Sequence, residues 1–334
     1  MKIVFNTHAP LMLAHGGAEI QLERTQAGLQ ELGVAVEPLR WWDRSQGADV
    51  LHQFGSMPAS LIRAAHVKGW KVANTLLFTQ TCNRSPGELL FRKLCVQSAL
   101  RAPLPGALRA MMPWRNYHLC DRIVVGIEAE RTLLENVYGL KPTQVSVVPL
   151  GLSNVFLKAT PASRKSNHLI YTGRIHPSKG SLELARLAHE TKAPVLFVGK
   201  PLEPESNYWQ QFKSLVDGVC VKLQDHVDSE QSMVELLQNA RGYVLLSHYE
   251  NWCLSAHEAA ACGLPLLVPD QPWSRERFGD QAHYFPRGKR GAAAALRQFY
   301  EECPQLPAPK IRFYSWLEVA GILRGVYAGM LNGH

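Results

Sequence analysis

Short apolar runs alternate with longer mixed segments along nearly the whole chain. Each apolar run has the length of a strand buried on both faces, and each mixed segment has the spacing of an amphipathic helix. Strands that alternate with helices form parallel sheets covered by helices on both sides, so we predict an α/β fold. The predicted strands are 3–5, 34–36, 50–52, 72–74, 122–125, 145–148, 169–171, 195–198, 219–221, 242–246 and 266–268.

A polar stretch interrupts this alternation once. The turn at 149–151 leads into 160–167, where Ser, Thr, Pro and basic residues gather as they do in linkers. A chain of 334 residues also suits two domains of about 150 residues each. We therefore predict two parallel-sheet units, and we expect a cleft at the carboxyl ends of their strands.

Composition limits the class of protein. Hydrophobic residues make up 46% of the chain and charged residues 19%, which is typical of a globular protein. The first apolar run is too short for a secretory signal, and no run is long enough for a spanning helix. We therefore expect a cytoplasmic protein. The seven cysteines show no CxxC pair, which favours reduced buried thiols and argues against a metal site.

The net charge of +8 is unevenly distributed. Residues 84–122 contain seven Lys and Arg against Glu88 and Asp121, with large apolar residues between them. Such a segment suits a peripheral contact with the inner membrane face, and equally suits helices with basic outer faces. We expect no nucleic-acid partner, because no binding motif accompanies the charge.

Two glutamates follow the predicted strand 242–246. Glu250 is expected on a loop at the carboxyl end of that strand, where α/β proteins bind ligands. Glu258 is expected in the first turn of the next helix, where the helix dipole keeps its carboxylate ionised. Such a carboxylate accepts hydrogen bonds from sugar hydroxyls. The spacing of Ser255 and Glu258 also fits a capping box, in which Glu258 would only bond to the helix start.

Two glycine-containing loops add weaker signals. Arg174 and Lys179 follow the strand 169–171, and two cations at a helix entrance suit a diphosphate. Gly16 and Gly17 follow the first strand, and they allow the backbone to approach a phosphate or sugar. A third glycine at the dinucleotide-binding spacing is missing, which argues against a dehydrogenase or an epimerase. Alone, this second loop equally indicates a tight turn.

Taken together and in this order, these residues resemble the family 4 retaining glycosyltransferases of the GT-B fold. Glu250 and Glu258 fit the Glu-x7-Glu motif of that family, and Arg174 and Lys179 fit its Gly-Arg…Lys-Gly loop. Further likeness lies in 16–19, 120–125, 147–151, 258–265 and 313–316. The resemblance implies an acceptor-side Rossmann-like domain at 1–155 and a nucleotide-sugar domain at 156–312. It also implies a helix at 313–334 that crosses back to the first domain.

The resemblance also implies an activity and residue roles. The protein would be a hexosyltransferase (EC 2.4) that moves a sugar from a nucleotide-diphosphate sugar to a hydroxyl, with retention and without cofactor or metal. Arg174 and Lys179 would neutralise the diphosphate, and Glu250 would contact the transferred sugar. Glu258 would hold the ribose hydroxyls. The implied donor site is completed by Gly16, Gly17, Asn251, Trp252, Cys253 and Leu254.

Two positions depart from the family pattern. The family usually has Glu-Gly-Phe-Gly where this chain has residues 250–253, which narrows the space beside the donor sugar. Leu77 occupies the position of a usual His, and Thr79, Gln80 or Asn83 could supply its polar contact. These departures motivate an alternative, a catalytically degenerate GT-B protein that binds nucleotide or a partner. The acceptor stays open between a glycan, a lipid-linked sugar and a small molecule, as do the donor sugar and its base.

Overall fold

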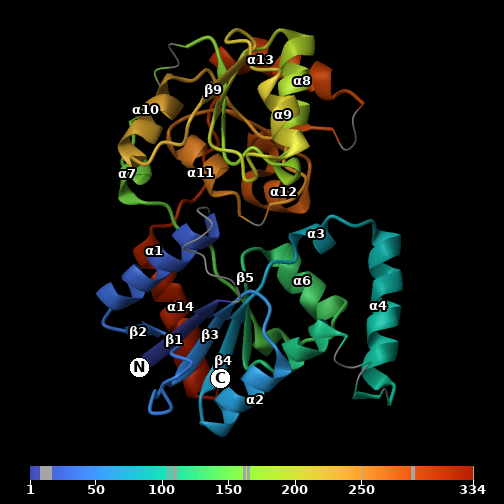
Figure 1. Cartoon of the computed structure of the whole chain (residues 1–334), viewed down its shortest axis with the longest axis vertical. Coiled ribbons are helices and arrows are strands. Elements are labelled where there is room, and N and C mark those ends of the chain that lie inside the picture. The colour runs from blue at the N-terminus through green and yellow to red at the C-terminus, as the bar shows by residue number, and fades with distance from the viewer. Residues whose placement is uncertain are drawn as a thin grey trace. The chain divides into compact units, whose positions relative to one another are not determined.

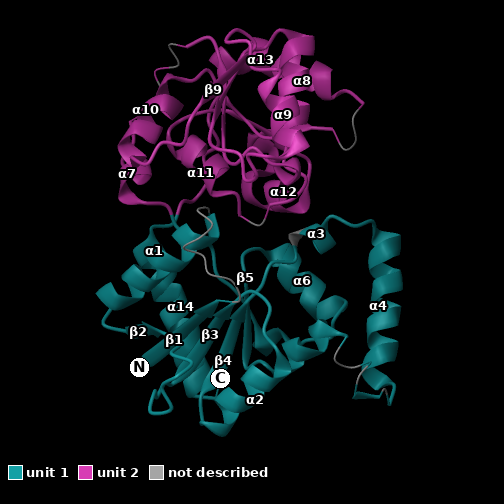
Figure 2. Ribbon diagram, in the orientation of Figure 1, with its two compact units in different colours: residues 1–151, 314–334 teal, residues 152–313 magenta. Residues whose placement is uncertain are grey.

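The computed structural model describes residues 1–7, 17–103, 105–106, 108, 111–160, 163, 166–250, 252–286 and 290–333. These residues form two compact units, coloured separately in Figure 2. Unit 1 consists of Met1–Gly151 and Tyr314–His334, and unit 2 of Leu152–Phe313. Each unit contains a six-stranded parallel sheet, so the predicted α/β class with two Rossmann-like sheets is confirmed.

The sheet of unit 1 has the strand order β2-β1-β3-β4-β5-β6. All six strands predicted in this part of the chain are present. The strands are β1 (Lys2–Thr7), β2 (Ala35–Pro38), β3 (Val50–Phe54), β4 (Lys71–Thr75), β5 (Arg122–Val125) and β6 (Val145–Val147). The helices are α1 (Gly17–Glu31), α2 (Ala59–Val67), α3 (Thr79–Cys82), α4 (Pro86–Arg101), α6 (Glu128–Asn136) and α14 (Trp316–Leu331), with 3-10 turns η2 (Pro113–Leu119) and η3 (Pro142–Gln144).

The last helix of the chain belongs to unit 1. Figure 1 shows α14, in red, beside the blue α1. The two helices approach closely at Gly28, where a Cβ atom would lie 2.9 Å from Cβ of Ala320. Leu323 and Tyr327 of α14 are buried in the same apolar cluster as Ile3 of the first strand. The core of unit 1 is therefore built from both ends of the chain.

The sheet of unit 2 has the order β12-β11-β10-β7-β8-β9. Its strands are β7 (Leu169–Thr172), β8 (Val195–Val198), β9 (Val221–Gln224), β10 (Tyr243–Val244), β11 (Leu266–Pro269) and β12 (His283–Phe285). Its helices are α7 (Asn154–Leu157), α8 (Ser181–Thr191), α9 (Asn207–Lys213), α10 (Glu230–Asn239), α11 (Leu254–Ala261), α12 (Pro272–Phe278) and α13 (Ala292–Glu302), with 3-10 turns η4 (Pro177–Lys179), η5 (Gly279–Gln281) and η6 (Cys303–Gln305).

Three strands of unit 2 differ from the prediction. Strand β10 spans only Tyr243–Val244, where 242–246 was predicted. The sequence pattern did not predict β12, an edge strand in which only Phe285 is fully buried. The strand predicted at 219–221 begins only at Val221, because the preceding residues form a turn. In that turn, Oδ1 of Asp217 accepts the backbone N–H groups of Val219 and Val221, each at 2.9 Å.

The order of strands places the loops that matter for function. The chain runs from β7 through β8 to β9 on one side of β7, and it then returns to place β10 on the other side. The neighbours β7 and β10 therefore flank a topological switch point, the place where open α/β sheets bind their ligands. These two loops contain the basic residues after β7 and Glu250 after β10.

The described residues also bear on two bulk predictions. The seven cysteines are free, and five of them are buried. Among the helices formed by the described residues, none has both the length and the hydropathy to cross a membrane.

Candidate active site

The loops after β7 and β10 lie against each other. Gly180 has φ of +62°, and a Cβ atom there would overlap the carbonyl oxygen of Leu246. The backbone N–H of His248 donates to the carbonyl oxygen of Ser178 at 2.9 Å. A glycine is required at position 180 for both its backbone conformation and its lack of a side chain. This contact brings the basic loop to Glu250.

Lys179 and Glu250 form an ion pair between these loops. The ammonium group of Lys179 contacts Oε1 of Glu250, and the hydroxyl of Ser247 donates to the same oxygen at 2.6 Å. Burial is the largest single effect and would lower the pKa of Lys179, but the charge of Glu250, the electrostatic effect of Cys253 and the hydrogen bond to Glu250 together raise this pKa above its ordinary value. Lys179 is therefore a cation at neutral pH.

Arg174 supplies a second positive charge near Lys179. Its charge acts on Lys179 and lowers the pKa of the lysine, although the other effects outweigh it. The carbonyl oxygen of Arg174 accepts a hydrogen bond from the hydroxyl of Tyr171 at 2.7 Å, which fixes the backbone just after β7. The structure thus brings together three of the predicted site residues, the cations Arg174 and Lys179 and the carboxylate Glu250.

Helix α11 begins differently from the prediction. Its N-cap is Cys253, which has φ of +57° and makes no side-chain capping bond. The hydroxyl of Ser255 instead pairs with the hydroxyl of Tyr243 at 2.8 Å, so the capping box is not formed. Glu258 lies in the second turn of α11 rather than the first. Its carboxyl group is therefore not used to start the helix.

The expectation that Glu258 is kept ionised by the helix dipole is wrong. Burial raises the pKa of this carboxyl group to about 7, and the charge of Glu230 adds to the rise. The first helical turn is where the dipole is strongest, and Glu258 lies beyond it. At neutral pH this group can therefore donate as well as accept a hydrogen bond.

The loop before α11 is held by a buried stack. The ring of Trp252 is 2% exposed and stacks on His257 at 5.0 Å between centroids. The guanidinium of Arg277 lies 3.7 Å from the centroid of the Trp252 ring. Burial lowers the pKa of His257 to about 3, so this ring is neutral. The side chain of Trp252 therefore fixes the loop from inside unit 2.

Cys253 replaces a glycine of the family pattern and still adopts the left-handed conformation. A non-glycine residue pays about 1 kcal/mol or more for that conformation. Lys192 is the other non-glycine residue with positive φ among the described residues. Cys253 thus keeps the left-handed backbone conformation that a glycine would adopt without strain. Its thiol is buried beside the hydroxyl of Ser255.

The remaining predicted residues lie elsewhere. Gly16 and Asn251 lie outside the described residues, while Gly17 begins α1 in unit 1 and Leu254 begins α11 in unit 2. Leu77, at the position of the usual His, follows β4 in unit 1 and is 63% exposed.

Two polar residues at the sheet edges escaped the sequence analysis. Ser247 directly follows an apolar run, and a polar residue at the carboxyl end of a predicted strand is a signal of a site residue. Glu130 is fully buried in unit 1 and accepts the N–H groups of Phe78, at 2.6 Å, and Gly126, at 3.1 Å. It thereby ties together the loops after β4 and β5. Nothing in the sequence distinguishes Glu130 from Glu128, two positions earlier.

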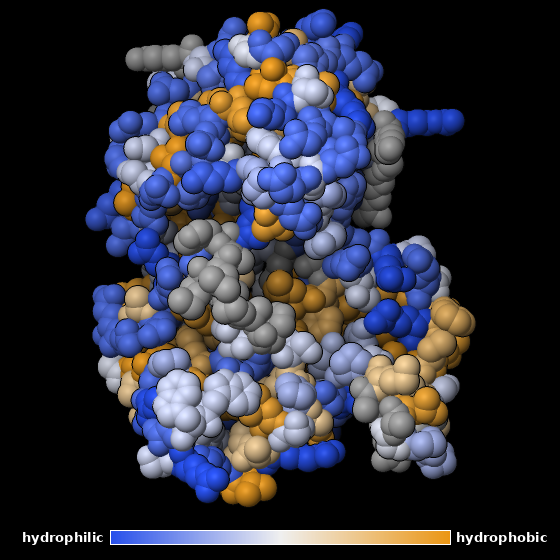
Figure 3. All heavy atoms as spheres, viewed as in Figure 1, coloured by the Kyte–Doolittle hydropathy of each residue, from blue (hydrophilic) through white to orange (hydrophobic). Residues whose placement is uncertain are grey.

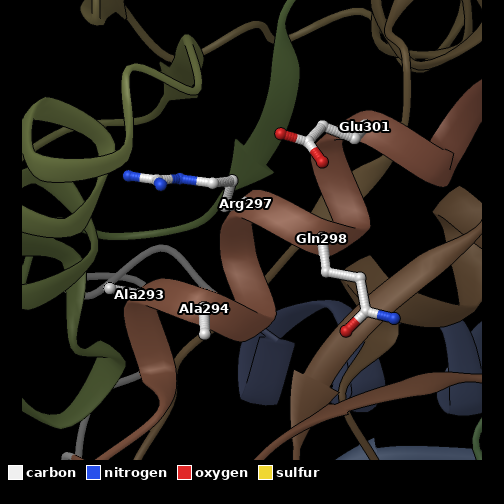
Figure 4. A pocket seen from close by; sticks show the side chains of 5 residues that line it. All are labelled: Ala293, Ala294, Arg297, Gln298 and Glu301. Carbon is white, nitrogen blue, oxygen red and sulfur yellow. The ribbon is translucent and has the colours of Figure 1, made fainter.

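A surface hollow on unit 2 is separate from these residues. Figure 4 shows its lining side chains, all of which come from α13. They are Ala293, Ala294, Arg297, Gln298 and Glu301. Because none of the predicted site residues lines this hollow, we do not assign it a role.

One side-chain cluster among the described residues has metal-ligating chemistry. His189, Asp217 and Cys220 place one ligand atom each within 4.8 Å of the others. Asp217 already holds the turn before β9, and a ring nitrogen of His189 bonds to the carbonyl oxygen of Leu215 at 2.8 Å. Asp217 and Cys220 precede β9, at the end of the sheet opposite Lys179. The cluster therefore has no part in the candidate site.

Comparison with known proteins relates unit 2 to one family. Residues 155–306 match the sequence model of the family Glycosyl transferases group 1. The D-inositol 3-phosphate glycosyltransferase of Acidothermus cellulolyticus is 26% identical over 171 residues. That match covers 44% of this chain and 38% of the relative, so less than two fifths of the relative's length is matched.

Solved structures resemble the chain over its full length. Sucrose-phosphate synthase from Thermosynechococcus elongatus has a TM-score of 0.67 at 14% identity, covering 100% of this chain and 99% of that one. Anabaena Alr3699/HepE in complex with UDP and glucose has a TM-score of 0.64 at 14% identity, covering 98% and 99%. At such identities the likeness concerns the fold. Residues 155–306 are therefore similar to the glycosyl transferases group 1 family, and the chain has the GT-B fold that the resemblance implied.

Proposed function

We propose that this protein is a retaining hexosyltransferase that transfers a sugar from a nucleotide-diphosphate sugar to an acceptor hydroxyl without a metal ion. The observation that carries the proposal is the contact of Lys179 with Glu250 at the switch point of unit 2, with Arg174 nearby. A diphosphate and a sugar need cations and a hydrogen-bond acceptor side by side, and this edge supplies both. The Anabaena neighbour, solved with UDP and glucose, supports this class of donor.

The two cations would act on the leaving group. As the bond from the sugar C1 to the diphosphate breaks, negative charge grows on the diphosphate oxygens. Lys179 and Arg174 would stabilise that charge in the transition state, in place of a divalent metal. The acceptor oxygen would bond to C1 on the face that the diphosphate leaves, and the acceptor proton would pass to a phosphate oxygen.

The two glutamates would hold the donor. Glu250 would accept hydrogen bonds from hydroxyls of the transferred sugar, which requires the donor diphosphate to take its place beside Lys179. Glu258 would bond to the ribose hydroxyls, and its pKa of about 7 allows it to donate or accept. Backbone N–H groups from Asn251 to Leu254, with Gly16 and Gly17, would complete the donor site. The implied lack of cofactor is part of the same proposal.

Two variants separate the roles of the ion pair. Lys179→Ala removes one charge-assisted contact, so we expect nucleoside diphosphate to bind about ten- to a hundredfold more weakly. Glu250→Gln releases Lys179 from its partner, so we expect nucleoside diphosphate to bind at least as tightly as in the unaltered protein. Sugar transfer by Glu250→Gln should nevertheless fall by at least tenfold. Calorimetry with UDP, GDP and ADP, each with and without EDTA, measures the binding.

The matched control is Lys213→Ala, an exposed lysine at the end of α9. It should bind nucleotide like the unaltered protein. If no nucleotide of the panel binds, or if Lys179→Ala and Lys213→Ala behave alike, the proposed site is wrong. NMR of the product anomer tests retention, and loss of transfer in EDTA would contradict metal independence.

A degenerate GT-B protein is the second candidate, because the exposed Leu77 cannot supply the polar contact of the usual His. That candidate predicts nucleotide binding without release of nucleoside diphosphate from any sugar donor. Turnover of one donor, by transfer or by hydrolysis, would exclude it.

A further inference from the structure

Helix α4 of unit 1 has a large apolar stripe on its outer face. Leu90, Phe91 and Leu94 are 59%, 70% and 58% exposed. Leu94 lies one turn along the helix from both Leu90 and Phe91, so the three side chains share one side of the helix. The opposite face packs on unit 1 through the buried Val96 and the partly buried Leu89. Figure 3 shows apolar side chains, in orange and tan, on the surface over α4.

The inner face of α4 contains a charge where an apolar residue is usual. Nε of Arg92 donates to the hydroxyl of Tyr138 at 3.0 Å, and the guanidinium lies 5.7 Å from the centroid of that ring. A helix that faces water has its polar residues outside and its apolar residues inside. In α4 the large apolar side chains lie outside and Arg92 lies inside, which is the reverse of this arrangement. Its outer face therefore suits contact with a partner better than contact with water.

The surroundings of the stripe are basic. Arg84 and Arg101 are exposed at its two ends, and Lys93 lies on its flank. The acidic Glu88 accepts the N–H of Ser85 at 2.9 Å in the cap of α4, and it also forms an ion pair with Arg84 at 3.8 Å. The partner that complements this face is therefore apolar beneath a layer of negative charge.

Charge and area both argue against a second copy of this chain as the partner. Two copies meeting at α4 would bring basic residues together, which costs binding energy. A stable dimer buries about 800 Å² on each partner, and a stripe of three large side chains on one helix falls short of that area. A bilayer with anionic headgroups has both required layers, and it accepts a helix lying flat in its interface.

We propose that the outer face of α4 binds the surface of an anionic lipid bilayer. Leu90, Phe91 and Leu94 enter the boundary between headgroups and acyl chains, while Arg101 pairs with lipid phosphates. The family resemblance implies that unit 1 is the acceptor side, but this membrane binding does not depend on the proposed function. It would persist in a protein that transfers no sugar.

Co-sedimentation of the full chain with vesicles tests the proposal. We expect binding to vesicles of phosphatidylcholine with 30 mol% phosphatidylglycerol at 50 mM NaCl, and little binding to phosphatidylcholine alone. Replacing Leu90, Phe91 and Leu94 together by Ser should lower the partition coefficient by at least tenfold. Arg101→Glu should lower it by about fivefold or more, since each basic residue near the surface contributes about that factor.

Matched controls distinguish binding through α4 from nonspecific binding caused by exposed apolar residues or by net charge. The triple variant Val67→Ser, Leu202→Ser and Val219→Ser alters three exposed apolar residues elsewhere, and it should bind vesicles normally. Arg63→Glu changes the net charge by the same amount as Arg101→Glu, but at an exposed position on α2. It should lower the partition coefficient less than Arg101→Glu does. Circular dichroism and thermal melting check that every variant is folded.

Three results would overturn the proposal. One is no binding to the anionic vesicles, and another is equal binding by the α4 triple variant and the control triple variant. The third is a dimer in light scattering that the α4 triple variant converts to a monomer, which would assign the stripe to a second copy. Unchanged nucleotide binding in the α4 variant would show that a failure here leaves the proposed function untouched.

Discussion

At the residue scale, burial sets the protonation state of Glu258. Its pKa of about 7 lies above the ordinary value of 4.5, so the folded protein keeps a proton that the unfolded chain releases between these values. The folded state is thus favoured below pH 4.5, and that advantage is lost as the pH rises through 7. One pKa unit corresponds to about 1.4 kcal/mol, which sets an upper limit of about 3 kcal/mol.

Glu258→Gln should remove this dependence on pH. Glutamine keeps the shape of the side chain but does not ionise. Between pH 5 and pH 8 the free energy of unfolding of the unaltered protein should fall by about 2 kcal/mol relative to the variant. Urea unfolding of both proteins at four pH values in this range measures the difference. Glu235→Gln, at an exposed site on α10, is the control. Parallel curves for all three proteins would contradict the prediction.

Residue types in the candidate site could be predicted from the sequence, but their states could not. Arg174, Lys179 and Glu250 stand out because their letters and spacing match a motif, and the structure brings them together. The ionisation of Glu258 depends on packing that no local pattern contains. The buried Glu130 is hidden for the same reason, since its partners are 52 and 4 residues away in the chain.

At the scale of elements, Gly180 fixes the junction between the loops after β7 and β10. Alanine at this position must adopt φ of +62° and also overlap the carbonyl oxygen of Leu246. Gly218 has φ of +72° but nothing within 4 Å of a Cβ atom. Alanine at Gly218 therefore tests the free-energy cost of the left-handed conformation alone, whereas alanine at Gly180 adds the cost of the overlap with Leu246.

We expect Gly218→Ala to lower the free energy of unfolding by about 1 kcal/mol, the usual cost of the left-handed conformation. Gly180→Ala should cost at least twice as much, and it should also weaken nucleotide binding because Lys179 is the preceding residue. Urea unfolding and calorimetry measure the two effects. Equal stability of the two variants would show that the loops can separate without cost.

Element prediction succeeded where burial was complete. Strand β8 is apolar throughout and β7 is apolar except for its last residue, Thr172, and both strands are fully buried, so their sequence pattern is unambiguous. The edge strand β12 is only partly buried, and its sequence has no apolar run that distinguishes it from a loop. The start of α11 was misplaced because Cys253 caps the helix through its backbone conformation, which a cysteine does not signal.

At the scale of the whole molecule, unit 1 depends on the end of the chain. The pattern of strands indicates two units, but it does not show that α14 completes the core of the first. A polar contact in that core joins the two segments. Nδ1 of His52, on β3, lies 2.5 Å from the hydroxyl of Tyr327 on α14, and Nε2 lies 2.7 Å from Oγ1 of Thr75. Burial lowers the pKa of His52 to about 3, so the ring is neutral.

Tyr327→Phe tests how firmly α14 is held. The change keeps the ring packed but leaves Nδ1 of His52 buried without its partner, which costs about 1 to 3 kcal/mol. Because His52 and Tyr327 both belong to unit 1, hydrogen exchange should accelerate in β3 and α14 and stay unchanged in β7 and β8. Tyr249→Phe, at a 42% exposed site in unit 2, is the control and should alter neither. Equal protection of α14 in both variants would mean that apolar packing alone holds the helix. Faster exchange throughout both units would mean instead that the two units unfold together, so that the end of the chain stabilises the whole protein.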